Sequence, residues 1–327
     1  MIWLRGTTGQ SQSQMTSQTS VESKFLGGLL GSALGDAIGE LAFEHRNEDA
    51  LRAQVAQSET LTYTDDTAMS IGLAESILQT GEIDQQQLGD TFRANFKREP
   101  WRGYASGPPT VFAIVERLGV SYTDAAQSLF QGMGSFGNGA AMRIAPVGLF
   151  FHDSSSLYEQ VQLSATVTHA HPLGVDGAAV LARAIAQAVE LDPQEPLSRD
   201  RFIASLLDFS RTREMWDKLT LVGELLEEDV LPMIAAVRLR QSVTTHESVP
   251  FAVYAFLHYP HSFEDCLFCA ALNGGDRDTL AAMACAISGA YLGVEAIPLP
   301  WREKIENRQH IEDLAIGLLK SRQTGDG

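Results

Sequence analysis

Two short acidic segments, more than 200 residues apart, have the side chains best suited to chemistry. They are Tyr63-Thr64-Asp65-Asp66-Thr67 and Gly274-Gly275-Asp276-Arg277-Asp278-Thr279. Adjacent carboxylates repel each other unless they share a positive partner. Carboxylates and hydroxyls without His or Cys suit hard octahedral cations such as magnesium better than zinc or copper, although calcium and manganese also take such ligands. The two segments together therefore indicate a metal site.

Both segments also have the features of helix starts. Apolar residues follow the first segment at helical spacing, and a run of small residues follows the second through Gly289. A Thr or Asp at the start of a helix accepts hydrogen bonds from N–H groups that lack an intrahelical partner. Capping accounts for one side chain but not for a Thr and two carboxylates in succession. For the first segment taken alone, capping and metal binding both stay open.

The apolar pattern of the whole chain predicts an all-α fold. From Lys24 onward apolar residues recur every three or four positions, and few runs alternate as strands would require. No repeat or linker interrupts residues 24–322, so we expect one multi-helix bundle at 23–323, preceded by a disordered leader at 1–22. Further helices are predicted at 66–80, 87–97, 121–131, 138–151, 172–190, 199–209, 249–258, 263–272, 277–292 and 310–321.

Composition and charge exclude several classes of function. The 327 residues are 44% hydrophobic and 20% charged, as in a globular enzyme, and no stretch approaches the roughly 20 uninterrupted apolar residues that span a bilayer. The net charge of −17 and the absence of a Lys/Arg cluster argue against a nucleic-acid partner. The only cysteines, Cys266, Cys269 and Cys285, are too few for a disulfide framework, so we expect buried thiols, not a zinc site, and a cytoplasmic protein.

The two acidic segments belong to a larger set of motifs. Together with Gly35-Asp36-Ala37-Ile38-Gly39 they resemble the signature of the ADP-ribosylglycohydrolase family. The resemblance covers most of the chain in the expected order, and it favours the branch that cleaves serine-linked ADP-ribose and poly(ADP-ribose) over the arginine-linked branch. Further matching stretches are Arg102-Gly103-Tyr104, Gly134 to Arg143, Thr168-His169, Glu247-Ser248-Val249-Pro250 and Gly293.

This resemblance implies an orthogonal all-α bundle with two magnesium ions, or manganese in their place, in a central cleft. Asp36 would steady the ligands from behind, as supporting residues do around metals. A carboxylate would handle protons as the anomeric C–O bond breaks through an oxocarbenium-like transition state. The implied metal ligands are Thr64, Asp65, Asp66, Asp276, Asp278 and Thr279.

Two glutamates compete for the proton-handling role. The family's glutamate usually lies seven residues after the Asp of the Gly-Asp motif, where this sequence has Phe43. Glu44 is one residue further on, and one extra residue in the loop would restore the match, so we favour Glu44 over the alternative, Glu40. Arg277 also departs from the family, which commonly has Thr there. We expect its side chain to point away from the cations as an exposed ion-pairing residue, with a phosphate contact as the alternative.

The resemblance also implies a site for ADP-ribose. Residues 132–139 resemble the family's diphosphate and ribose cradle, where small residues let backbone N–H groups approach phosphate oxygens. Phe130 or Phe136 would pack against adenine, although both could equally belong to the core. The residues expected to contact substrate are Phe130, Gly134, Ser135, Phe136, Gly137, Asn138, His169, Gly107 and Ser248.

The resemblance therefore predicts a magnesium-dependent hydrolase that cleaves the O-glycosidic bond at the anomeric carbon of ADP-ribose. Its partners would be ADP-ribosylated protein, poly(ADP-ribose) or O-acetyl-ADP-ribose, and we expect a monomer without membrane or nucleic-acid partners. Three alternatives stay open: an arginine-linked acceptor, another phosphorylated small molecule, and a non-catalytic ADP-ribose-binding or structural protein on the same fold.

Overall fold

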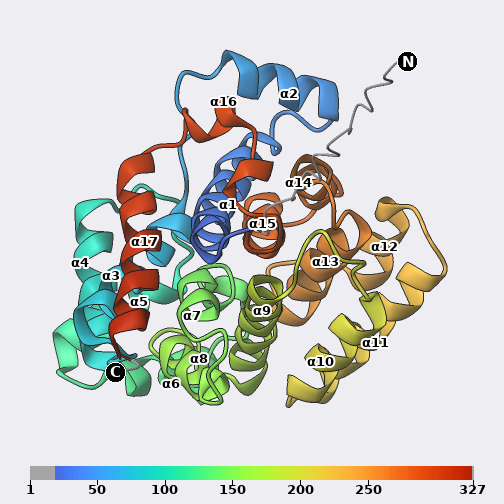
Figure 1. Ribbon diagram of the computed structural model, residues 1–327. Helices are drawn as coiled ribbons and strands as arrows, with labels where there is room; N and C mark the ends of the chain where they lie inside the picture. Colours follow the sequence, from blue (N-terminus) through green and yellow to red (C-terminus); the bar gives the residue numbers. More distant parts are fainter. Residues whose placement is uncertain (1–18, 326–327) are drawn as a thin grey trace, which may run out of the picture.

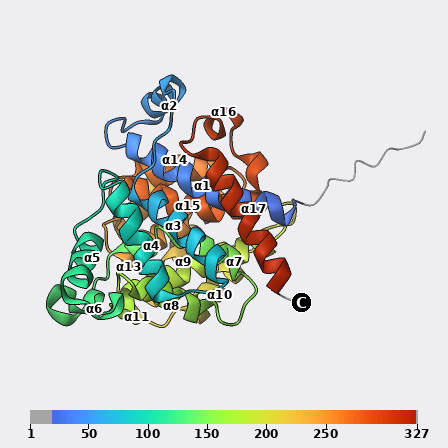
Figure 2. The same cartoon turned by 90° about the vertical axis from the view of Figure 1, so that its left-hand side faces the viewer.

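Two long helices from opposite ends of the chain lie side by side at the centre of the molecule. In the computed structural model, which describes residues 19–325, α1 (Val21–Leu41) and α15 (Arg277–Leu292) run antiparallel and the other helices surround them in several directions (Figures 1 and 2). The described residues form no strand; their only bridges are Leu61 with Ile305 and Gly137 with Thr244. The predicted all-α, single-bundle fold is confirmed.

The remaining helices follow in chain order. They are α2 (Glu48–Gln57), α3 (Asp65–Thr80), α4 (Gln85–Arg98), α5 (Gly107–Leu118), α6 (Tyr122–Gly132), α7 (Ala145–Phe150), α8 (Leu157–Thr166), α9 (Pro172–Glu190), α10 (Arg199–Phe209), α11 (Arg213–Glu227), α12 (Pro232–Leu239), α13 (Thr245–His258), α14 (Phe263–Leu272), α16 (Leu299–Arg302) and α17 (Arg308–Gly325), with 3₁₀ turns at Asn138–Ala140 and Val294–Ala296.

Glycines at every fourth position of α1 allow the backbones of α1 and α15 to touch. A methyl group added to any of them would come within 2.2 to 2.6 Å of an α15 backbone atom, so no larger residue fits. Residues four apart lie on one face of a helix, which gives this contact a fixed register. The pairs are Gly27 with Gly289, Gly31 with Cys285, Gly35 with Ala281 and Gly39 with Asp278. This register brings the end of α1 to the start of α15, where the second acidic segment lies.

Several predicted helices are confirmed to within one residue, namely α3, α9, α10, α14 and α15. The prediction of one helix at 138–151 is wrong: a 3₁₀ turn ends at Ala140 and α7 begins only at Ala145, with Pro146 in its first turn. Helix α6 loses helical geometry at Leu129, earlier than predicted. Helix α13 begins at Thr245 and continues through Pro250, whereas the prediction placed its start at 249.

Five helices longer than one turn were not predicted: α2, α5, α8, α11 and α12. Helix α2 buries only Leu51 and Val55, so its apolar pattern is short. Helix α5 begins at Gly107, and its next two residues are prolines. Such a sequence is typical of a loop, although proline is well tolerated in the first turn of a helix.

Helix α1 begins close to the start of the described chain. The part of the predicted leader up to residue 18 lies outside the described residues, whereas Val21 and Glu22 already belong to α1. Ser20 caps this helix, because its hydroxyl accepts a hydrogen bond from the Ser23 N–H at 3.0 Å.

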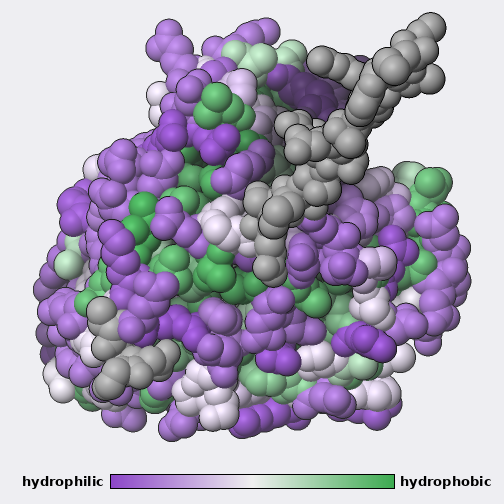
Figure 3. Space-filling view, in the orientation of Figure 1, coloured by the Kyte–Doolittle hydropathy of each residue, from purple (hydrophilic) through white to green (hydrophobic). Residues whose placement is uncertain are grey.

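The described chain has one helix, α9, that is long and apolar enough to cross a membrane, but 89% of that apolar stretch is buried inside the molecule. Such burial is typical of a core helix. The face in Figure 3 is mainly hydrophilic, with an apolar band across its middle. All three cysteines are free and buried, which confirms the expectation of buried thiols.

Candidate active site

The two acidic segments line a single cleft of about 420 Å³. The starts of α3 and α15 form one part of its wall, and segments from four other regions of the chain form the rest. Its lining includes Asp65, Asp66, Asp276, Asp278 and Thr279 of the predicted ligands, and Gly107, Phe130, Ser135, Phe136, Gly137, Asn138 and His169 of the predicted substrate contacts. The fold therefore brings most of the predicted site residues together.

A buried carboxylate on α1 fixes the first acidic segment. Asp36 is completely buried and accepts hydrogen bonds from the Thr64 N–H at 3.0 and 3.1 Å. It also accepts from the N–H of Thr67 at 3.0 Å and from its hydroxyl at 2.6 Å. Thr64 itself caps α3, because its hydroxyl accepts from the Asp66 N–H at 3.5 Å. Capping by Thr64 and the hydrogen bonds to Asp36 together fix the backbone of this segment.

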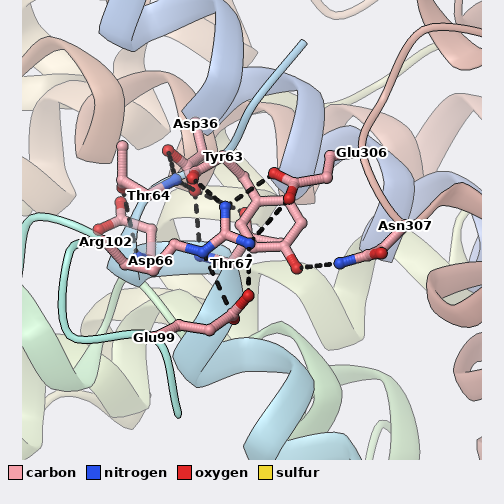
Figure 4. Close-up of polar contacts among 9 residues, drawn as sticks. All are labelled: Asp36, Tyr63, Thr64, Asp66, Thr67, Glu99, Arg102, Glu306 and Asn307. Atoms are coloured by element: carbon pink, nitrogen blue, oxygen red, sulfur yellow. Dashed lines mark hydrogen bonds and ion pairs between the residues drawn. The ribbon is translucent and has the colours of Figure 1, made fainter. Parts of the chain in front are cut away.

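A buried arginine fixes the first residue of this segment, Tyr63, as Figure 4 shows. Arg102 donates to the Tyr63 carbonyl at 3.1 Å, and its guanidinium lies 4.2 Å from the centre of the Tyr63 ring. It also donates to both carboxylate oxygens of Glu306, at 2.7 and 2.8 Å, and to Glu99 at 3.0 Å. Bidentate pairs of this kind fix direction as well as distance. Arg102 therefore joins the first acidic segment to residues 103–107 of the cleft wall and to the chain before α17.

The second acidic segment contacts both the end of α1 and the glycine-rich residues 132–139, the glycine loop. A side chain on Gly39 would collide with the Asp278 Cα at 2.6 Å, so α1 lies directly against this segment. The Asp278 carboxylate accepts from the Thr279 N–H at 2.8 Å. Asn138 donates its amide to the Asp276 carboxylate at 2.8 Å, which links the predicted metal ligands to the predicted substrate loop.

Three aspartates of the cleft, Asp65, Asp66 and Asp278, have pKa values raised above the ordinary range. Burial, with repulsion from Asp36 and Asp276, raises the pKa of Asp65 to about 7. Burial and the same two neighbours raise the pKa of Asp278 to about 8. The pKa of Asp66, which is only 2% exposed, lies well above its ordinary value for the same reasons. Positive charge in the cleft would relieve this repulsion.

The donor set fits hard cations. The Asp66 Oδ2 atom is buried and has no hydrogen-bond partner, so a ligand position is available there. Within residues 19–325, no three His, Cys, Asp or Glu side chains converge closely enough to hold an ion by themselves. Magnesium usually takes one or two carboxylates and completes its shell with water and substrate oxygens. Pairs of aspartates with the hydroxyls of Thr64 and Thr279 match that pattern.

His169 borders the cleft as a neutral imidazole. Burial, with the nearby Arg143 guanidinium, lowers its pKa to about 3. Its Nδ1 pairs with the Thr168 hydroxyl at 2.8 Å, and a side chain on Gly139 would collide with its Cε1 and Nε2 atoms at 2.7 and 2.8 Å. His169 can therefore contact a ligand by hydrogen bonding but not by charge.

Both predicted aromatic contacts are partly exposed and are not core residues. Phe130 is 58% exposed, and its backbone has φ of 50°, in the left-handed region that non-glycine residues rarely adopt. Phe136 is 39% exposed and packs edge-on against His171 with ring centres 5.2 Å apart. Strained backbone of this kind is common at functional sites.

Several predicted residues lie away from the cleft wall. Ser248 is fully buried in α13, where its hydroxyl donates to the Thr244 carbonyl. The prediction that Ser248 lines the cleft is therefore wrong. Gly134 packs against the backbone of Ala170 and His171. Arg277 points away from the carboxylates, as expected. It is half-buried and donates to the Ala271 carbonyl, so the prediction of an exposed ion-pairing side chain is wrong.

The two candidate glutamates lie at the end of α1, and neither lines the cleft. Glu44 is exposed in the turn that follows the helix, with its N–H donating to the Leu41 carbonyl at 3.3 Å. Glu40 is exposed in the last turn of α1, close enough to Asp278 for its charge to raise the pKa of that carboxyl.

The cleft also contains residues that the sequence did not reveal. Val243 and Thr244 line it from the segment between α12 and α13, and Gly103 lines it from the loop after Arg102. Gly103 belongs to the matching stretch Arg102-Gly103-Tyr104, which pointed to this part of the chain. Val243 and Thr244 belong to no recognised motif, so nothing in the sequence pointed to them.

Comparisons with known proteins identify the family of this chain. A family model described as ADP-ribosylglycohydrolase matches residues 17–327. ADP-ribosylhydrolase ARH3 of Mus musculus is 35% identical over 291 residues, which are 80% of this chain and 78% of that protein. The ARH3 of Homo sapiens is 32% identical over 292 residues, which are 80% and 79% of the two chains.

One further sequence relative and one solved structure are also similar to this chain. An uncharacterized protein of Archaeoglobus fulgidus is 34% identical over 269 residues, which are 78% of this chain and 79% of that protein. A solved structure described as an ADP-ribosylglycohydrolase-related protein complex has the same fold, with a TM-score of 0.65 and 22% identity over 92% of this chain and 99% of that one. With a family model across nearly its whole length and relatives above 30% identity, the chain belongs to the ADP-ribosylglycohydrolase family of hydrolases.

Proposed function

We propose that the protein is a magnesium-dependent hydrolase that cleaves the bond at the anomeric carbon of ADP-ribose, releasing it from a serine-linked, polymeric or O-acetyl acceptor. The main support is one observation: four aspartates from two distant helix starts face a single cleft, and the glycine loop contacts one of them through Asn138. Thr64, Asp65, Asp66, Asp276, Asp278 and Thr279 would hold two magnesium ions, or manganese in their place. Bound magnesium would orient the ribose hydroxyls and offset the negative charge that develops as the bond breaks.

The residues of the glycine loop would hold the rest of the substrate. Gly137 and Gly139 line the cleft without side chains, which leaves room for a diphosphate beside this loop. The neutral His169 would hydrogen-bond a ribose or phosphate oxygen. Phe130 and Phe136 offer partly exposed rings to adenine on the rim of the cleft.

A carboxylate at the end of α1 would move the proton. We propose Glu44 for this role, with Glu40 as the alternative, and the carboxyl would protonate the leaving oxygen or take a proton from water. Because neither glutamate lines the cleft, a second function is worth testing, namely recognition of ADP-ribose without turnover.

The decisive experiment incubates purified protein with serine-ADP-ribosylated peptide, with magnesium or with a chelator, and measures free ADP-ribose. Asp276→Ala should abolish release, while Asp208→Ala, a charge change on α10 away from the cleft, should leave it unchanged. Parallel reactions contain arginine-linked ADP-ribose, poly(ADP-ribose) and O-acetyl-ADP-ribose. Release only from the arginine-linked substrate would reassign the acceptor. Binding of ADP-ribose without release from any substrate would establish the binding role instead.

A further inference from the structure

The segment between α12 and α13 has an unusual backbone. Arg240 has φ of 66° and ψ of 166°, although it is not a glycine and its side chain is largely exposed. A non-glycine residue keeps such a conformation only where its surroundings enforce it. The next residue, Gln241, is half-buried and lies against the turn that presents Asp276.

Gln241 contacts this turn through both its backbone and its side chain. Its carbonyl accepts a hydrogen bond from the Asp276 N–H at 3.2 Å. Its side-chain amide donates to the Asn273 carbonyl at 2.9 Å. A side chain on Gly275 would come within 1.9 Å of the Gln241 carbonyl oxygen, so the turn is packed directly on Gln241. Gly274 and Gly275 both have positive φ, so the turn has little stiffness of its own.

The same segment also holds the glycine loop. The Val243 carbonyl accepts from the Asn138 N–H at 2.9 Å, and the Thr245 N–H donates to the Phe136 carbonyl at 3.1 Å. Asn138 in turn donates its side-chain amide to Asp276 at 2.8 Å. These bonds close a circuit from Gln241 through Asp276 and Asn138 back to Val243, two residues after Gln241.

A buried carboxylate on α13 keeps the segment in place. Glu247 accepts from the Ser242 hydroxyl at 2.6 Å and pairs with Arg240 at 3.3 Å. It is 9% exposed, so these bonds are largely shielded from water. The position of Gln241 is therefore set by α13 and not by the flexible turn that it contacts.

We propose that Gln241 is a positioning residue that sets the direction in which Asp276 presents its carboxylate to a bound cation. The inference depends on the proposed magnesium site, to which it adds a residue that touches neither the cation nor the substrate. Groups that orient metal ligands through hydrogen bonds typically change metal affinity by about 10–100-fold when they are removed.

The test compares wild-type protein with Gln241→Met, which keeps the length of the side chain but removes its amide. Gln86→Met, on the exposed face of α4, is the matched control. Magnesium binding is measured by calorimetry, and the magnesium dependence of ADP-ribose release and the melting temperature without magnesium are measured alongside. Gln241→Asn, which keeps the amide but is too short to reach Asn273, is a second variant should the methionine variant fail to fold.

Gln241→Met should weaken magnesium binding about 10–100-fold. Release at saturating magnesium should recover most of the wild-type rate, and the melting temperature without magnesium should change little. Unchanged magnesium affinity would overturn the inference, as would a lower melting temperature with no change in magnesium dependence. If wild-type protein itself neither bound magnesium nor released ADP-ribose, the proposed function would fail and the inference with it. If the inference alone were wrong, wild-type protein would bind magnesium and release ADP-ribose, and Gln241→Met would bind magnesium as tightly as wild type.

Discussion

Asp36 accepts hydrogen bonds from both the backbone N–H and the hydroxyl of Thr67, at 3.0 and 2.6 Å, although it does not line the cleft. The same carboxylate accepts from the Thr64 N–H, so its two oxygens face N–H and O–H donors only. Burial raises its pKa to about 6, while these hydrogen bonds act in the opposite direction. Asp36 thus fixes the start of α3, and its support of metal ligands stays a prediction.

Asp36→Asn should impair both stability and the site. The amide replaces one acceptor oxygen with an NH₂ group that faces other donors, so we expect the unfolding free energy to fall by about 1–3 kcal/mol. We also expect magnesium to bind about 10–100-fold more weakly. Urea unfolding and a magnesium titration of release measure the two effects. Asp176→Asn is the control, because Asp176 is equally buried and accepts from Thr212 and Arg211 away from the cleft. It should cost stability without changing the response to magnesium.

Gly35→Ala should separate α1 from α15. The new methyl group would lie 2.3 Å from the Ala281 carbonyl oxygen, and neither backbone can yield locally. We expect a loss of at least about 1–3 kcal/mol, despite the roughly 1 kcal/mol by which alanine favours a helix over glycine. Gly28→Ala on the same helix should be close to neutral, because its methyl group meets side chains and no backbone: Leu149 at 3.1 Å and the Ala290 Cβ at 3.5 Å. Equal stability of the two variants would contradict the close-contact argument.

Paired substitutions at the end of α1 should identify the proton-handling glutamate. If Glu44 has this role, Glu44→Gln should lower ADP-ribose release by about 10²–10⁴-fold, with little effect on ADP-ribose binding because the substitution preserves shape. Glu40→Gln should have a smaller effect, through its proximity to Asp278. Single-turnover rates and calorimetric binding of ADP-ribose distinguish the two. A large loss for Glu40→Gln alone would reassign the role to Glu40.

His152 should make the protein less stable in mild acid. Burial, with the Arg322 charge, lowers the pKa of His152 to about 4 from an ordinary value of 6.5. Between pH 6.5 and 4 the unfolded chain takes up a proton that the folded protein excludes, so stability falls as pH falls through this window. His152→Gln should flatten that part of the pH dependence of the unfolding free energy, measured in urea at pH 7, 5.5 and 4.5. An unchanged slope would mean that His152 is protonated in the folded state.

The sequence by itself determined the fold class, most of the helices around the cleft and the acidic residues to be tested as metal ligands. Residue types and helix starts are local features, so Asp65, Asp66, Asp276 and Asp278 could be proposed as ligands without a structure. Helices such as α9 and α15 have long apolar patterns and were predicted with nearly correct ends. Helix α2, with two buried apolar residues, lacks such a pattern and was not predicted.

Only the tertiary structure decided how these parts meet. The contact of Gly39 with Asp278 joins residues from opposite ends of the chain, and no local pattern contains that pairing. The same is true of Arg102 with Glu306, and of Gln241 with Asp276. Ser248 and Arg277 were misplaced because a side chain's surroundings depend on which distant segments pack beside it. Sequence fixes residue type and local conformation, whereas long-range packing decides which groups face the cleft.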